Sequence, residues 1–132
     1  MGDLSKNFSR SEFACKCGDC EVNVVDAELI KILQDLHDSL SEAWGAPIKI
    51  TINSGCRCWD HNEEIGGATY SQHLLGKAAD IQVFFQDPQK NWIKIKALHT
   101  YKTLKDTYPN KYGIGNYVSF THIDIRSTRA RW

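Results

Sequence analysis

The chain carries the stretch SQHLLGKAAD at residues 71–80 and, much later, THID at residues 121–124. Together they offer two imidazoles, His73 and His122, and the carboxylate of Asp80, with a further carboxylate two residues after the second imidazole. Two histidines and one carboxylate are a usual ligand set for a catalytic zinc, which keeps a fourth position for water. If these side chains converge in space, they could hold a metal that activates water for hydrolysis.

Both motifs fall in segments with the alternation of a β-strand. Residues 78–85 carry apolar side chains at alternate positions and Asp80 on the opposite face. In residues 120–125, His122 and Asp124 are two positions apart and therefore point to one face. Polar groups in the middle of a sheet face are costly unless they are paired or bind a metal. We therefore interpret Asp80 and His122 as metal ligands.

His73 precedes the first of these strands. Gly76 separates it from residues 78–85 and permits a sharp turn that would return the imidazole to Asp80. A single histidine is more often structural than a metal ligand, and the spacing alone leaves both roles open. The ligand set that we expect is His73, Asp80 and His122.

The remaining segments predict a small α+β domain. We expect helices and strands in the order helix, strand, strand, helix, strand, strand, at residues 27–44, 48–52, 78–85, 88–107, 112–118 and 120–125. Asp26 and Gly45 are suited to begin and end the first helix, and the loop at 53–67 holds one helical turn near 60–65. This order predicts one domain over residues 1–132, with a small, mostly antiparallel sheet flanked by helices.

Size and charge limit the classes of partner. The 132 residues include 16 basic and 16 acidic side chains, and a net charge of zero argues against nucleic-acid binding. No apolar run approaches the length of a membrane span. Residues 1–10 are polar, so we see no signal peptide, and the localisation stays unknown. We expect a monomer.

The motif at residues 71–80 resembles, at every fixed position, the S-x-H-x-x-G-x-A-x-D signature of the zinc D-alanyl-D-alanine carboxypeptidases. That family, peptidase family M15, also contains L-alanyl-D-glutamate endopeptidases and phage endolysins. Residues 120–124 resemble its F-x-H-x-D signature, and residues 54–57 resemble its S-G-[YF]-R segment with Cys56 in place of the aromatic residue. The phrase FSRSEF at residues 8–13 and the closing ARW are similar to the small, phage-like branch.

The resemblance implies the fold that these enzymes share with the amino-terminal signalling domain of hedgehog. It also implies that His73, Asp80 and His122 bind one catalytic Zn²⁺, and that Arg57 binds a substrate carboxylate or the developing oxyanion. The implied function is hydrolysis of peptide bonds in peptidoglycan stem peptides or cross-links, by a carboxypeptidase or an endopeptidase. A phage or prophage lysis enzyme fits this pattern. Such an enzyme would be delivered by the phage, reside in the host cytoplasm before lysis, or be exported by another route.

The general base is less well defined. Many relatives place a Glu or Asp three residues before the last histidine ligand, where this chain has Ser119. Asp124 is the nearest alternative, and it could either take the proton of water or orient His122. Ser71 and Gln72 are expected to bind substrate or brace the site. Four aromatic residues could line a substrate groove or belong to the core: Trp59, Tyr70, Tyr112 and Tyr117.

The missing acidic residue leaves alternatives to an enzyme. The chain could be a non-catalytic, zinc-containing binding module, because the fold alone does not imply proteolysis. It could also be a phage structural component that carries this domain.

The five cysteines occur in two clusters. Cys15, Cys17, Cys20 and Cys58 could form a second, structural zinc site that ties the N-terminal arm to the loop holding Arg57. One or two disulfides, or simple thiols, are the other interpretations.

Overall fold

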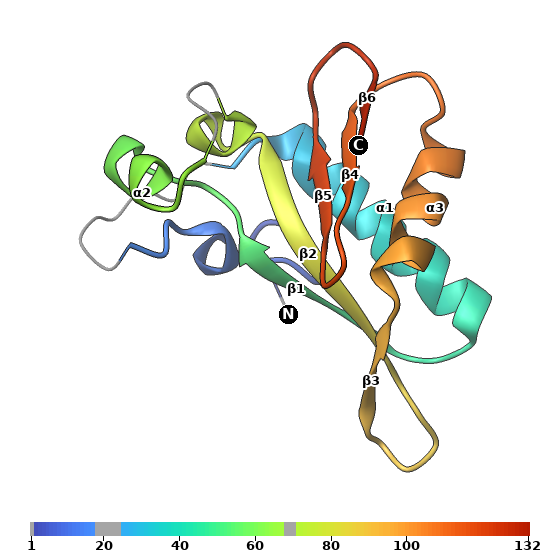
Figure 1. The fold of residues 1–132 in the computed structure, drawn as a ribbon. Coiled ribbons are helices and arrows are strands. Elements are labelled where there is room, and N and C mark those ends of the chain that lie inside the picture. The colour runs from blue at the N-terminus through green and yellow to red at the C-terminus, as the bar shows by residue number, and fades with distance from the viewer. Residues whose placement is uncertain (1, 18–24, 68–70) are drawn as a thin grey trace.

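The computed structural model describes residues 2–17, 25–67 and 71–132. Its centre is a six-stranded sheet in the order β1-β2-β5-β4-β6, with β3 paired to β2 (Figure 1). The strands are β1 (Ile48–Ser54), β2 (Ala78–Gln86), β3 (Trp92–Ile95), β4 (Gly113–Asn116), β5 (Thr121–Asp124) and β6 (Ala130–Arg131). The helices are α1 (Ala27–Trp44), α2 (Trp59–Glu64) and α3 (Ala97–Thr107), with short 3₁₀ helices η1 (Arg10–Phe13) and η2 (Gln72–Leu75). Among the described strand pairs only β4 and β6 run parallel, which confirms the expected α+β fold.

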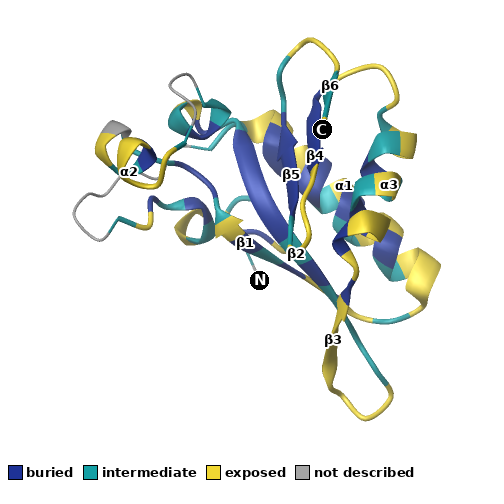
Figure 2. Ribbon diagram, in the orientation of Figure 1, coloured by how far each residue is buried: buried dark blue, intermediate teal, exposed yellow. Residues whose placement is uncertain are grey.

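Helices α1 and α3 pack against the sheet, and the hydrophobic core lies between them and the strands. The central strands β2, β4 and β5 are largely buried, whereas the outer sides of the helices and the tip of the β3 hairpin are exposed (Figure 2). The core residues of the helix α1 recur at helical spacing: Leu29, Ile32, Leu33, Leu36 and Leu40. Burying one such side chain contributes about 1.5–3 kcal/mol, so this layer is the main source of stability.

The first helix begins and ends where expected. The Asp26 side chain accepts a hydrogen bond from the Glu28 amide, and Gly45 ends the helix in the left-handed conformation with φ of 59°. A side-chain oxygen at the N-cap satisfies an amide that has no partner within the helix. The strands predicted at 48–52 and 78–85 are also confirmed, and both continue a little further along the chain.

The single helix expected over residues 88–107 is wrong in its first half. The Asp87 side chain accepts a hydrogen bond from the Asn91 amide at 2.8 Å, and Lys90 adopts a positive φ of 67°. These contacts close a turn, after which β3 pairs with the end of β2 and α3 begins only at Ala97. Local Asp hydrogen bonds and the two β-branched isoleucines of β3 both favour a hairpin over a helix here.

Alternation along β2 separates the core from the opposite face of the sheet. Ile81 and Val83 are buried in the core cluster, whereas Asp80 and Gln82 have the other parity. Strand β5 repeats the pattern, with Ile123 in the core and His122 opposite. The helices cover the first face, so the polar side chains gather on the second. Within the described residues, no helix combines the length and apolar character needed to cross a membrane.

Candidate metal centre

Strand register brings the first two expected ligands together. Strands β2 and β5 pair antiparallel with Asp80 directly opposite His122. The Nδ1 atom of His122 lies 2.8 Å from Asp80 Oδ1. Directly opposed side chains on one sheet face have Cβ atoms about 4.5–5.5 Å apart, which suits shared coordination of one ion.

The turn before β2 brings the third expected ligand, His73, to the other two. Ser71 caps η2 by accepting a hydrogen bond from the His73 amide, and Gly76 follows η2 with a φ of 67°. This left-handed residue reverses the chain and leaves His73 Nε2 3.3 Å from Asp80 Oδ2. One ligand atom from each of His73, Asp80 and His122 lies within 4.8 Å of the others.

The state of His73 suits a metal ligand. Its Nδ1 lies 2.6 Å from the carbonyl oxygen of Gly55, and since a carbonyl only accepts, Nδ1 carries the proton. The Nε2 atom then presents a lone pair, and it is buried with no hydrogen-bond partner among the described residues. A buried polar atom without a partner is costly. A metal ion shared with Asp80 would satisfy it, so the donor set fits zinc.

Asp124 lies behind His122. Its Oδ2 is 2.8 Å from His122 Nε2, so the imidazole bridges two carboxylates. Asp124 is fully buried, and its oxygens also accept hydrogen bonds from the Gly113 amide and from the Arg126 guanidinium at 2.7 and 2.8 Å. Gly113 is needed here, because a Cβ at this position would lie 2.5 Å from both carboxylate oxygens.

Asp80, His122, Asp124 and Arg126 form a row of charged groups in contact, called the charge row here. The charges of this row stabilise one another. Burial by itself raises the pKa of Asp80, but the hydrogen bond from His122 and the nearby imidazoles of His122 and His73 lower it well below the usual range. Burial likewise raises the pKa of Asp124, and the stronger combined effect of His122 and Arg126 lowers it. Burial lowers the pKa of His122, and its two carboxylate partners raise it overall.

Arg57, the cation that the sequence predicted for the site, lies beside the expected ligand Asp80. Its Nη2 lies 3.4 Å from Asp80 Oδ2, while Nε donates to Ser54 and Nη1 donates to Asn62. Burial lowers the pKa of Arg57, and the charge of Asp80 partly offsets this. The anchoring role of the buried Asn62 was missed, because a polar residue in the short helix α2 has no distinctive spacing in the sequence.

The three expected ligands share one cleft of about 500 Å³ with Arg57, Ser71 and Gln72. The residues that line it are Arg57, Gly66, Gly67, Ser71, Gln72, His73, Asp80, Tyr117, Phe120, His122, Arg126 and Trp132. Asp124 is not among them. Trp132 was not predicted to contact the site: β6 pairs with β4 and brings its indole 5.1 Å from the His122 ring, centre to centre. A two-residue strand has too little alternation to be found from the sequence.

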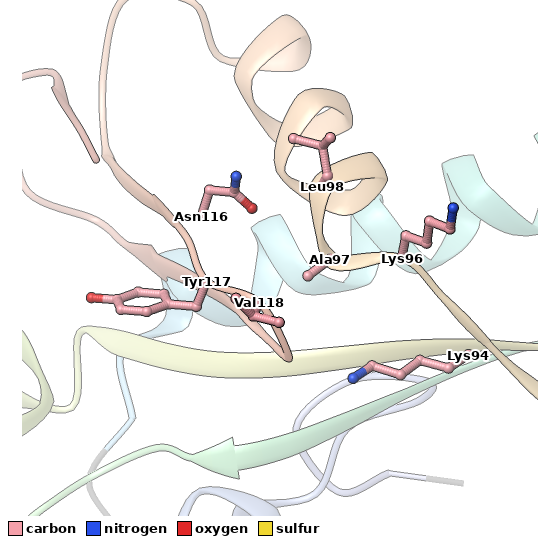
Figure 3. A pocket seen from close by; sticks show the side chains of 7 residues that line it. All are labelled: Lys94, Lys96, Ala97, Leu98, Asn116, Tyr117 and Val118. Carbon is pink, nitrogen blue, oxygen red and sulfur yellow. The ribbon is translucent and has the colours of Figure 1, made fainter.

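A second hollow, of about 440 Å³, adjoins the first at Tyr117, which lines both. Figure 3 shows the Tyr117 ring pointing away from Leu98 and Lys96, at the edge of this hollow. Lys94 and Lys96 give it a positive character, and Val118 beside them is fully exposed. Of the four aromatic residues considered, Tyr117 therefore lines both hollows.

The other expected positions divide between several places. Tyr112 belongs to the core, whereas Tyr70 and Cys20 lie outside the described residues, as does the side chain of Trp59. Cys15, Cys17 and Cys58 form a second group whose sulfur atoms lie within 4.8 Å of one another. Ser119 turns its backbone carbonyl to Lys94, which donates to it at 2.6 Å.

A family model described as Peptidase M15 matches residues 6–124, which is most of the chain. The matched region contains all three candidate ligands and Arg57. No curated protein matches the chain significantly.

The charge row predicts a pH dependence for protein stripped of metal by a chelator. Since the folded state raises the pKa of His122 above 6.5, the stabilisation is complete below that value and is lost as pH rises through the raised pKa. We expect the free energy of unfolding, measured by urea denaturation, to fall as the pH rises above about 6.5. His122→Gln should flatten this decline, whereas the exposed His99→Gln should retain it. An equal decline in His122→Gln would contradict the assignment.

Proposed function

Because this chain belongs to the peptidase M15 family, we propose that it is a zinc-dependent peptidase that hydrolyses peptide bonds of peptidoglycan stem peptides or cross-links. Membership of this family indicates a metallopeptidase. The main support for zinc is the convergence of His73, Asp80 and His122 in an open cleft. In the part of the chain that the structure describes, the buried His73 Nε2 has no hydrogen-bond partner.

In this proposal His73 Nε2, an Asp80 oxygen and His122 Nδ1 hold the zinc. Bound there, zinc would polarise the scissile carbonyl and lower the pKa of a water molecule toward neutrality. Arg57 lines the same cleft and is fixed by Ser54 and Asn62. Its guanidinium donates to the oxyanion that develops on the carbonyl, or to a neighbouring carboxylate of the substrate.

Asp124 acts in this proposal as a positioning residue. Its oxygens accept hydrogen bonds from His122, Arg126 and Gly113, and it is fully buried outside the cleft. Water in the cleft therefore has no direct path to this carboxylate. Asp124 holds the proton on His122 Nε2, which leaves Nδ1 with the lone pair for the metal. Carboxylates commonly orient metal-binding histidines in this way.

The two adjoining hollows favour a substrate that extends past the cleaved bond, and we therefore propose endopeptidase activity. The lysines beside Tyr117 suit a peptide rich in carboxylates, as peptidoglycan stems are. Ser71 and Gln72 line the cleft and offer hydrogen bonds to the peptide backbone.

One observation favours a second candidate, a zinc-containing binding module. Among the described residues that line the cleft, Asp80 is the only carboxylate, and Ser119 stands where many relatives have an acid. A general base contributes about 10²–10⁴-fold to such reactions. An inert protein that binds zinc and peptidoglycan would therefore support the module.

The first test is digestion of purified peptidoglycan. The wild type should lower the turbidity of a cell-wall suspension, and mass spectrometry should find new peptide termini within stems or cross-links. Chelation removes the metal and His73→Ala removes one of its ligands, so each should abolish the digestion. His99→Ala should leave the digestion intact. Release of only single terminal residues would indicate a carboxypeptidase. A zinc-loaded wild type that cuts nothing would refute the enzyme.

Replacing Arg57 tests its role in the cleft. Loss of one oxyanion donor costs about 10²–10³-fold in kcat, so Arg57→Met should fall by this order. Arg57→Lys keeps the charge but loses the two-pronged donor, and we expect it to recover only part of the rate. Steady-state kinetics on a defined muropeptide would measure both. Wild-type kcat in Arg57→Met would exclude the role.

Replacing Asp124 separates its two suggested roles. Asp124→Asn removes the charge that orients His122, so we expect zinc affinity, measured by chelator competition, to weaken about 10–100-fold. Activity should then return in excess zinc. If Asp124 were instead the proton acceptor, zinc affinity would change little and excess zinc would not restore activity. Asp106→Asn, on the exposed side of α3, is the matched control.

A further inference from the structure

The second group of possible ligands is not among the residues that line the cleft, and it lies where the N-terminal arm meets the loop after β1. Cys15 and Cys17 belong to the arm, and Cys58 precedes α2 at the end of the loop. We infer that Cys15, Cys17 and Cys58 bind a structural Zn²⁺ that fastens the arm to this loop. This site is independent of whether the cleft hydrolyses a peptide bond.

The sulfur distances fit coordination to one ion. Cys58 Sγ lies 3.8 Å from Cys15 Sγ and 4.0 Å from Cys17 Sγ. Tetrahedral zinc with Zn–S bonds of about 2.3 Å places its sulfur ligands about 3.8 Å apart. A disulfide needs an S–S distance of about 2.05 Å, so these pairs have the spacing of zinc ligands and not of a covalent bridge.

Backbone amides point to the same sulfurs. The Cys58 amide donates to Cys15 Sγ at 3.4 Å, and the His61 amide donates to Cys58 Sγ at 3.4 Å. Amide donors stabilise the thiolate, which is the form that binds metal. Binding to three thiols releases three protons, one from each Sγ, and leaves three Zn–S bonds. We assign no residue to the fourth position.

The location explains what such an ion would do. The arm approaches the loop closely, because the Cys56 amide donates to the Phe13 carbonyl at 2.8 Å and a Cβ on Gly55 would lie 2.7 Å from Phe13 Cα. The same loop supports the candidate catalytic centre. The Gly55 carbonyl holds His73 Nδ1, and the Arg57 amide donates to the His73 carbonyl at 3.0 Å.

A zinc clip at the cysteines would therefore restrain the two backbone groups that position His73, along with Arg57 itself. A metal that binds only the folded state stabilises it. Release of this ion should loosen the loop and weaken the catalytic centre without removing any of its ligands.

The experiment counts metal ions and identifies their ligands. Protein purified with reductant and zinc, then dialysed, should hold about two zinc ions per chain by mass spectrometry of the metal. Cys58→Ser and His73→Ala should each hold about one. Cys56→Ser is the matched control, because Cys56 lies in the same loop but outside the sulfur group, and it should retain both ions.

Cobalt identifies the sulfur site without any substitution. Wild-type protein loaded with Co²⁺ should show the strong near-ultraviolet absorption of thiolate-to-cobalt charge transfer. His73→Ala should keep this band and Cys58→Ser should lose it. Absence of the band in the wild type would overturn the inference, as would a Cys15–Cys58 disulfide, found as a mass lower by two hydrogens. Either outcome would leave the cleft and its zinc untouched.

Discussion

The pairing of Asp80 with His122 across β2 and β5 is the constraint on which the site depends. The two residues are far apart in the chain, and one register places them side by side on the uncovered face of the sheet. A slip of one residue in either strand would turn its ligand toward the core and bring Ile81 or Ile123 out to solvent. The hydrophobic layer under α1 and α3 therefore fixes the geometry of the polar layer above it. The same burial that stabilises the fold aligns the candidate ligands.

Burial also makes the polar row demanding. An imidazole between two carboxylates, with a guanidinium at one end, is favourable only if each charge keeps its partner. Asp124 has no exposure to solvent, so its charge depends on Arg126 and His122. At the other end, His73 Nε2 has no hydrogen-bond partner within residues 2–17, 25–67 and 71–132. The oxygens of Asp124 thus accept several hydrogen bonds, whereas His73 Nε2 keeps a lone pair that a metal can use. This difference is expected when hydrogen-bond partners on the far side of a metal ligand hold it in position.

Much of this could be predicted from local pattern. Strong periodicity identified α1 and β2, and the motif at residues 71–80 indicated side chains that do meet in space. The prediction of one helix over residues 88–107 failed because the Asp87 side chain closes a turn. Hydrophobic periodicity gives no information on such side-chain hydrogen bonds, which compete with helix formation. Trp132 and Asn62 reach the site through tertiary contacts. Neither residue belongs to a recognisable sequence pattern, so the sequence alone did not indicate their roles.

The loop between β1 and α2 links the two groups of possible metal ligands. Its Gly55 carbonyl fixes the tautomer of His73, its Arg57 faces the cleft, and its Cys58 belongs to the sulfur group. Loops are usually the most mobile part of a fold, yet catalytic groups must be held within about 0.5 Å of a productive position. Anchoring this short loop at one end by the β1 strand and at the other by the proposed metal would resolve this conflict. The N-terminal arm would then support the proposed catalytic centre, although none of its described residues lines the cleft.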